Sequence, residues 1–288
     1  MEKTIEMPEK VPAQHQDRQP GIESKMEPRP LYDNDEPGHS RLEGKVAIIT
    51  GGDSGIGRAV AIQYAKEGCD VAIVYLDEHG DAQETAEAVR KYGKEALLIP
   101  TDISQEVNCK YVVEKTLERF GHLHILVNNA AVQYEQQDIQ DITAEQLEYT
   151  FRVNMFSFFY LSKFAVAHLK EGGVIINTAS VNAYKGNQSL MDYSATKGAI
   201  VSFTRSLSQS LVKKGIRVNA VAPGPVWTPL IPASFKEEKV GKFGQDVPME
   251  RPAQPVEISP TYVFLASSDG AFFTGQVLHP NGGSIVNS

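Results

Sequence analysis

The chain has 288 residues, of which 22% are charged and 41% are apolar, and its formal net charge at pH 7 is −8. These proportions are typical of a globular protein. The negative charge argues against general nucleic-acid or anionic-membrane binding, because both need a basic surface. No run of about 18 apolar residues is present that would span a bilayer.

Cys69 and Cys109 are the only cysteines, and their spacing fits neither a disulfide framework nor a metal site. The seven histidines are scattered along the chain. The first residues contain no hydrophobic signal region. We therefore expect a cytoplasmic protein without a metal centre.

Residues 1–43 are rich in Pro, Glu, Gln and Lys and show neither helical nor strand periodicity. Such a segment cannot bury enough apolar surface to fold by itself. We expect a polar N-terminal arm that is partly disordered and adds little to the core. Leu31 and Tyr32 are among its few apolar residues and are candidates for contact with the rest of the chain.

From residue 44 onward, short strand-like runs alternate with helical stretches. The runs are apolar on both faces, which is typical of a parallel sheet covered by helices on either side. No repeat or low-complexity tract interrupts the alternation, so we expect residues 44–288 to form a single doubly wound α/β domain. The runs are residues 45–50, 71–75, 96–99, 124–128, 174–178, 217–222 and 275–280.

One helix carries signals at both of its ends. Thr143 and Gln146 have the spacing of a capping box, and Gly172 with Gly173 forms a stop signal. Between these ends, residues 151–169 are apolar around most of the helix, which indicates burial on both sides. This pattern predicts contact between copies of the chain.

A glycine-rich stretch, TGGDSGIGRA, follows the first strand at residues 50–59. A strand that turns through glycines into a helix places bare backbone N–H groups against a pyrophosphate. Gly51, Gly55 and Gly57 supply this turn, and the position between a strand and a helix favours a nucleotide site.

Tyr193 and Lys197 stand four residues apart, on one face of a predicted helix. Taken alone, the pair is typical of an ordinary amphipathic helix. A neighbouring ammonium, however, favours the phenolate and lowers the pKa of the tyrosine from about 10. Ser180 lies just past the fifth strand-like run and is able to hydrogen-bond a substrate oxygen.

Four motifs in order resemble the classical short-chain dehydrogenase/reductase family over residues 42–283. They are TGGDSGIG, the NNAA at 128–131, Ser180 with Tyr193 and Lys197, and Pro223 with Gly224. Within that family the chain resembles bacterial stress-associated oxidoreductases with a polar N-terminal arm. Ala131 departs from the family, which usually has Gly there.

The resemblance implies a Rossmann-type sheet of about seven strands and hydride transfer between a nicotinamide cofactor and a small alcohol, ketone or sugar. Tyr193 would be the general acid/base, Lys197 would lower its pKa and contact the ribose, and Ser180 would hold the substrate oxygen. Asn154 would orient a relay water; the alternative is a buried Asn that satisfies backbone groups. The cofactor-binding residues that we expect are Gly51, Asp53, Ser54, Gly55, Ile56, Gly57, Tyr75, Leu76, Asp77, Asp102, Ile103, Asn129, Ala130, Ala131, Thr178, Tyr193, Lys197, Pro223, Gly224, Val226 and Thr228.

The choice between NAD and NADP depends on the end of the second strand. Asp77 stands 20 residues after Gly57, close to the interval at which an acid receives the ribose hydroxyls and repels a 2′-phosphate. No Lys or Arg occurs between Asp77 and Val89. NAD is therefore favoured and NADP is possible. Asp77 falls one or two places later than the acid of the family, so Tyr75 or Leu76 is the alternative residue at the position of that acid. Asp102 would lie at the adenine, or would merely form a turn.

Residues 186–191 and 226–248 are expected to border the substrate, the second as a mobile lid by the same resemblance. Two rival functions remain open. One is a reductase of acyl groups on an acyl carrier protein, which would need a basic landing patch. The other is a nucleotide-binding regulator without catalysis. The resemblance also implies a homotetramer built through four-helix contacts and the last strand.

Overall fold

The computed structural model describes residues 7–286. Its strands are Val46–Thr50 (β1), Asp70–Tyr75 (β2), Ala96–Pro100 (β3), Ile125–Asn128 (β4), Val174–Thr178 (β5), Arg217–Val221 (β6) and Val277–Leu278 (β7). Its helices are Gly55–Lys66 (α1), His79–Lys91 (α2), Glu106–Phe120 (α3), Ala144–Phe151 (α4), Ser157–Val166 (α5), Asn182–Lys185 (α6), Met191–Leu211 (α7), Glu237–Val240 (α8) and Pro255–Ala266 (α9), with short turns between them.

In the described part of the chain, the strands form one sheet of seven in the order β3-β2-β1-β4-β5-β6-β7, and every neighbouring pair is parallel. This confirms the predicted doubly wound Rossmann-type fold. The strand order reverses between β1 and β4, where ligands of such sheets bind at the carboxyl ends of the strands. The segments that follow β1, β4, β5 and β6 therefore meet at one edge of the sheet.

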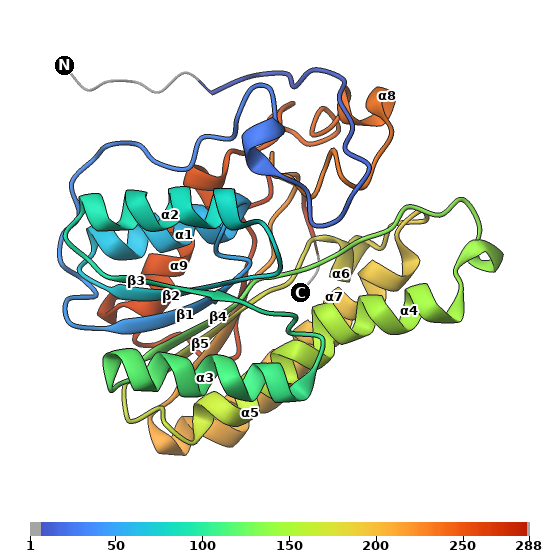
Figure 1. Ribbon diagram of the computed structural model, residues 1–288. Helices are drawn as coiled ribbons and strands as arrows, with labels where there is room; N and C mark the ends of the chain where they lie inside the picture. Colours follow the sequence, from blue (N-terminus) through green and yellow to red (C-terminus); the bar gives the residue numbers. More distant parts are fainter. Residues whose placement is uncertain (1–6, 287–288) are drawn as a thin grey trace.

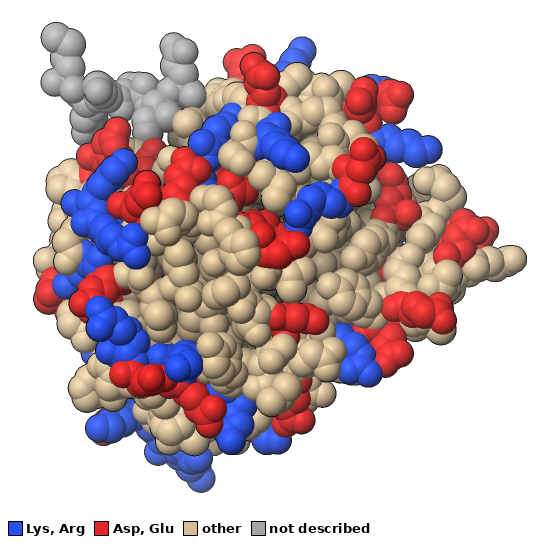
Figure 2. Space-filling model, in the orientation of Figure 1, with Lys and Arg blue, Asp and Glu red and all other residues tan. Residues whose placement is uncertain are grey.

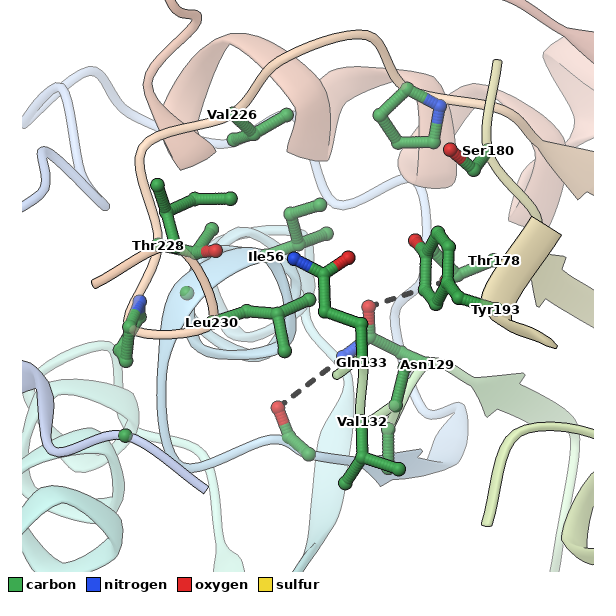
Figure 3. Close-up of a pocket in the computed structure, with 18 of the residues that line it drawn as sticks. Ile56, Asn129, Val132, Gln133, Thr178, Ser180, Tyr193, Val226, Thr228 and Leu230 are labelled. Atoms are coloured by element: carbon green, nitrogen blue, oxygen red, sulfur yellow. Dashed lines mark hydrogen bonds between the residues drawn. The ribbon is translucent and has the colours of Figure 1, made fainter. Parts of the chain in front are cut away.

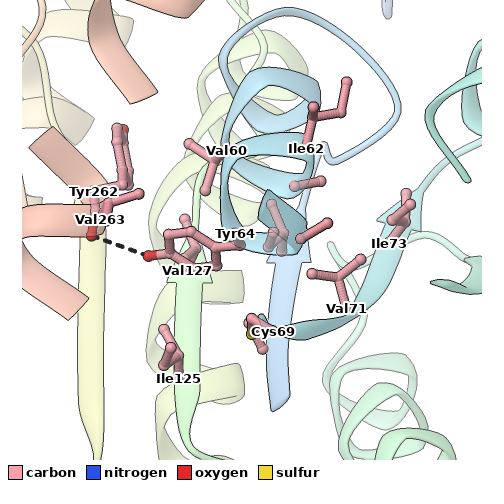
Figure 4. Close-up of a cluster of buried hydrophobic side chains, with 14 of the residues drawn as sticks. Val60, Ile62, Tyr64, Cys69, Val71, Ile73, Ile125, Val127, Tyr262 and Val263 are labelled. Carbon is pink, nitrogen blue, oxygen red and sulfur yellow. Dashed lines mark hydrogen bonds between the residues drawn. The ribbon is translucent and has the colours of Figure 1, made fainter. Parts of the chain in front are cut away.

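Alternate residues of each strand enter two different apolar layers, because successive side chains point to opposite faces of a sheet. Ile49 and Ile73 pack with α1, α2 and α9, whereas Ile48 and Val74 pack with α3 and α5 (Figure 1). Figure 4 shows the first layer, in which the Tyr64 hydroxyl donates to the backbone oxygen of Tyr262 at 3.2 Å. Both faces of the sheet are thus buried.

The predicted helix after Thr143 begins as expected and contains a π-helical segment in its middle. The Thr143 hydroxyl accepts a hydrogen bond from the backbone N–H of Gln146 at 3.1 Å. After α4, residues 152–156 form a π-helical segment, and α5 then ends at Val166, before the two glycines. The predicted single helix is therefore present as one uninterrupted helical run with a π-helical middle, but it ends at Val166, earlier than the predicted stop at Gly172.

The arm is ordered from residue 7, and the expectation that it adds little to the core is wrong for the described residues. Val11 and Met26 are each 3% exposed and belong to one apolar cluster with Trp227, which is fully buried. The Trp227 indole N–H donates to the backbone oxygen of Pro28 at 2.9 Å. The arm folds because the body of the protein supplies the apolar surface that it lacks. Any disorder expected in residues 1–6 lies outside the described residues.

Acidic and basic residues are interspersed over the face of the molecule drawn in Figure 2. Between residues 7 and 286, no helix has the length and apolar character needed to cross a membrane.

Candidate active site

A cavity of about 490 Å³ lies at the carboxyl ends of the central strands. This volume is within the usual range for small-molecule sites. Its lining includes the glycine-rich turn after β1, the segments after β4, β5 and β6, and residues of the predicted lid. Pro20 and Gly21 of the arm also line it. Figure 3 shows Ser180, Thr178 and Tyr193 on one side of the cavity, with Ile56, Thr228 and Leu230 on the other.

The glycine-rich turn brings strand and helix unusually close together. A Cβ on Gly57 would lie 1.9 Å from the backbone oxygen of Gly51, so no side chain fits there. Gly51 itself has a φ of +61°. The N–H groups of Ile56 and Gly57 have no acceptor among the described residues. A helix N-terminus with free N–H groups beside a cavity fits the pyrophosphate of a dinucleotide.

Asn129 joins this turn to the neighbouring strands. Its side-chain N–H₂ donates to the backbone oxygen of Thr50 at 3.0 Å, and its side-chain oxygen accepts from the Thr178 hydroxyl at 3.3 Å. The Thr50 hydroxyl in turn accepts from the backbone N–H groups of Asn129 and Ala130. The ends of β1, β4 and β5 are therefore held in fixed positions around the cavity.

Tyr193 and Lys197 lie on α7, one turn apart, and both are almost fully buried. The Lys197 Nζ lies 5.4 Å from the centre of the Tyr193 ring and donates to the backbone oxygen of Thr178 at 2.7 Å. Ser180, also buried, lines the same cavity, and its hydroxyl accepts from the backbone N–H of Asn182 at 3.1 Å. The three side chains that the sequence singled out share one end of the cavity.

Burial dominates the titration of this pair. It raises the pKa of Tyr193 to about 12, against the opposing effect of the Ser180 hydroxyl. It also lowers the pKa of Lys197 to about 7, because the charged ammonium is disfavoured away from water. Burial thus acts on the Tyr193 pKa in the direction opposite to the effect expected of Lys197, and the lowering of the Tyr193 pKa by Lys197 stays a prediction.

Asn154 lies in the π-helical segment and does not line the cavity. Its side-chain oxygen accepts from the backbone N–H of Val132, and its N–H₂ donates to the backbone oxygen of Val132, both at 2.8 Å. These bonds match the alternative that the sequence left open, a buried Asn that satisfies backbone groups. They hold the segment after β4 against the helix.

At the end of β2, the residues that line the cavity differ from those predicted from the sequence. Tyr75 and Leu76 line the cavity, whereas Asp77 does not, and Glu78 takes part in the lining instead. Asp77 is turned toward Arg18 of the arm, whose guanidinium Nη2 lies 2.5 Å from the Asp77 Oδ1. The prediction that Asp77 faces the cavity is therefore wrong. Its carboxylate is paired with Arg18, an arm residue far away in sequence.

For Asp102 the sequence left two roles open, a place at the adenine and a turn. Asp102 lines the cavity and also forms a turn, so the structure is compatible with both roles. Its carboxylate accepts from the backbone N–H of Ser104 at 2.9 Å and from the Ser104 hydroxyl at 2.8 Å.

Of the predicted residues, Gly57, Asp77 and Asn154 do not line the cavity, and the rest do. Sequence reasoning missed Pro20, Gly21 and Gln133, for which no local signal exists. Within the described residues, no group of three or more metal-ligating side chains comes together.

Comparisons with known proteins agree with this geometry. A family model described as enoyl-(acyl carrier protein) reductase matches residues 51–284. The chain is 55% identical to NADPH-dependent aldehyde reductase 1, chloroplastic, of Arabidopsis thaliana, over 96% of this chain and 98% of that protein. It is 53% identical to the glucose and ribitol dehydrogenase of Daucus carota, over 96% of this chain and 97% of that protein. A solved short-chain dehydrogenase from Burkholderia cenocepacia in complex with NADP superposes with a TM-score of 0.80 at 31% identity, covering 84% of this chain and 98% of that one.

Proposed function

Because this chain belongs to the short-chain dehydrogenase/reductase family of oxidoreductases, we propose that its cavity binds a nicotinamide cofactor and a small carbonyl or alcohol substrate, with Tyr193 as the proton donor and acceptor. The observation that carries this proposal is the placement of Ser180, Tyr193 and Lys197 in one cavity with the glycine-rich turn. The bound nicotinamide would supply or accept the hydride.

The chain's own residues perform the proton chemistry. With a pKa of about 12, the Tyr193 phenol is protonated at neutral pH and is ready to donate to a carbonyl oxygen. The Ser180 hydroxyl hydrogen-bonds that oxygen and holds it within reach of the phenol. Lys197 anchors the helix face to Thr178 at the end of β5, and Asn154 keeps the opposite wall in place through Val132.

Aldehydes and polyhydroxylated carbonyl compounds are the proposed substrates. Gln133, Asn187 and Asp246 add polar groups to a lining that is otherwise rich in apolar side chains, and such groups recognise hydroxyls. The names of the related aldehyde reductase and sugar dehydrogenase support this class. For the cofactor we propose that NAD is favoured and NADP is possible, since two carboxylates, Asp77 and Glu78, follow β2 and the second of them lines the cavity. The acyl-carrier reductase and the regulator stay as rival predictions.

The test is the substitution Tyr193→Phe, assayed with a panel of aldehydes, sugars and acyl thioesters in the presence of each cofactor. Because only the proton donor is removed, turnover should fall by at least about 10²-fold while cofactor affinity stays nearly unchanged. Tyr184→Phe is the matched control: the Tyr184 hydroxyl has no hydrogen-bond partner among the described residues and lies outside the cavity lining. Retained turnover in Tyr193→Phe would contradict the assignment, and activity confined to acyl thioesters would favour the first rival.

We further propose that the chain assembles as a homotetramer. Phe156 of the π-helical segment and Phe159 of α5 are 39% and 52% exposed. The ring centres of Phe159 and of Phe203 on α7 lie 5.3 Å apart. A second copy would cover this aromatic surface across a two-fold axis. Light scattering should report the tetramer at micromolar concentration, and a fully active monomer would contradict the proposal.

A further inference from the structure

Residues 16–22 of the arm, here called the strap, cross the cavity between two of its walls. The Gln16 side chain braces the strap internally: its N–H₂ donates to the backbone oxygen of Ile22, and its oxygen accepts from the Ile22 N–H at 2.7 Å. At one wall, the Gln19 side chain bonds both the N–H and the carbonyl oxygen of Gln133, after β4. Pro20 and Gly21, which follow Gln19 in the strap, line the cavity.

The second wall is contacted by Arg18, the residue before Gln19 in the strap. Its Nη2 lies 2.5 Å from the Asp77 Oδ1 and 3.0 Å from the Glu78 Oε1, and its Nε donates to the backbone oxygen of Pro20 at 2.9 Å. Arg18 is thereby held at the end of β2, at the rim of the cavity: Glu78 belongs to the cavity lining, whereas Arg18 and Asp77 lie just outside it. Among the described residues, no other Lys or Arg forms an ion pair with Asp77 or Glu78.

The charges at this corner decide which dinucleotide fits. In sheets of this type, the ribose next to the adenine lies at the end of the second strand, where a carboxylate favours NAD and an arginine favours the extra phosphate of NADP. Two carboxylates alone would repel that phosphate. Arg18 offsets them, and burial together with the Asp77 hydrogen bond raises the pKa of Glu78 to about 7, which reduces its charge near neutral pH.

We propose that Arg18 of the strap is a cofactor-specificity residue: its guanidinium receives the 2′-phosphate of NADP, so that the chain binds NADP as well as NAD. This inference rests on the proposed function. It also departs from what the sequence alone favours, because the stretch after β2 contains no basic residue and the arginine comes from a segment about 60 positions earlier in the chain. Its planar fork suits a phosphate, to which it can donate two hydrogen bonds.

The experiment measures equilibrium binding of NAD and NADP to the full-length protein by calorimetry, without turnover. Wild-type protein should bind both dinucleotides. Arg18→Gln should weaken NADP by about tenfold to a hundredfold, the value of a hydrogen bond to a charged group, and should change NAD by less than about twofold. Asp77→Asn should tighten NADP, because it releases the guanidinium from a competing carboxylate.

Arg29→Gln is the matched control. Arg29 also belongs to the arm, has a similarly exposed side chain and pairs with one carboxylate, that of Glu84, outside the cavity lining. The Arg29→Gln substitution should leave the affinities for NAD and for NADP unchanged. An Arg18→Gln variant that loses NAD and NADP equally, or neither, would overturn the proposal. If the wild type binds neither dinucleotide, the proposed function fails as well; if it binds NAD alone, only the role of Arg18 fails.

Discussion

The sheet and the arm became ordered in different ways. Each strand of the sheet has a local sequence signal, since successive residues such as Ile48 and Ile49 are both apolar and pack on opposite faces. The arm carries no such pattern, yet Met26 is as buried as a core residue. A low apolar content therefore predicts only that a segment cannot fold alone. Whether it folds depends on the surface against which it lies.

The polar residues of the arm show the same dependence. Glu23 is fully buried, accepts from the backbone N–H of Gly55 at 2.6 Å and pairs with the buried guanidinium of Arg58 at 2.5 Å. In sequence, Glu23 is one acidic residue in a charged stretch. In the structure, it fixes the arm to the first turn of α1, next to the proposed pyrophosphate site.

Truncation of one buried residue in each region, Met26→Ala in the arm and Leu126→Ala in β4, tests most strongly whether the arm is packed as firmly as the sheet. Each substitution should lower the free energy of unfolding by about 2–5 kcal/mol, because each leaves a cavity in a packed cluster. Urea denaturation followed by far-UV circular dichroism and by Trp227 fluorescence measures both effects. The two probes should report one coincident transition in every variant.

A separate early fluorescence transition in Met26→Ala, with the circular dichroism transition unshifted, would show that the arm unfolds independently. The arm would then be an attachment to the domain and not part of it.

A smaller effect concerns the titration of Lys197, which belongs to the sheet-and-helix region. Its pKa is lowered to about 7 in the folded chain, so between pH 7 and 10.5 the unfolded chain binds one proton more than the folded chain. Stability from this group therefore rises with pH, by up to about 1.4 kcal/mol per unit, and is lost as the pH falls through 7. Urea denaturation at pH 7 and pH 9 should show this gain in the wild type relative to Lys197→Met.

An equal pH dependence in the wild type and in Lys197→Met would mean that Lys197 keeps its charge when folded. In that case the ammonium would be available to lower the pKa of Tyr193, as the sequence suggested.

Much of the fold and of the site was predictable, because the relevant signals are local. The seven strands follow from runs of apolar residues, and Ser180, Tyr193 and Lys197 follow from their spacing. The position of Asp77 was predicted wrongly for a physical reason. Its partner Arg18 is 59 positions away in sequence, and no pattern near either residue predicts the ion pair. For Tyr193, burial raises the pKa in the folded chain, and the sequence does not display this burial.

The π-helical segment at residues 152–156 has a consequence for how the molecule tolerates change. One extra residue in a helical turn rotates everything after it by about 100° around the axis. Tyr149, before the segment, lines the cavity, while Phe159, after it, is half exposed. Deleting one residue there would restore a regular helix and turn the two halves out of phase. The length of this segment therefore sets the phase between the two halves of the helix, while the Asn154 side chain within it holds the helix against Val132.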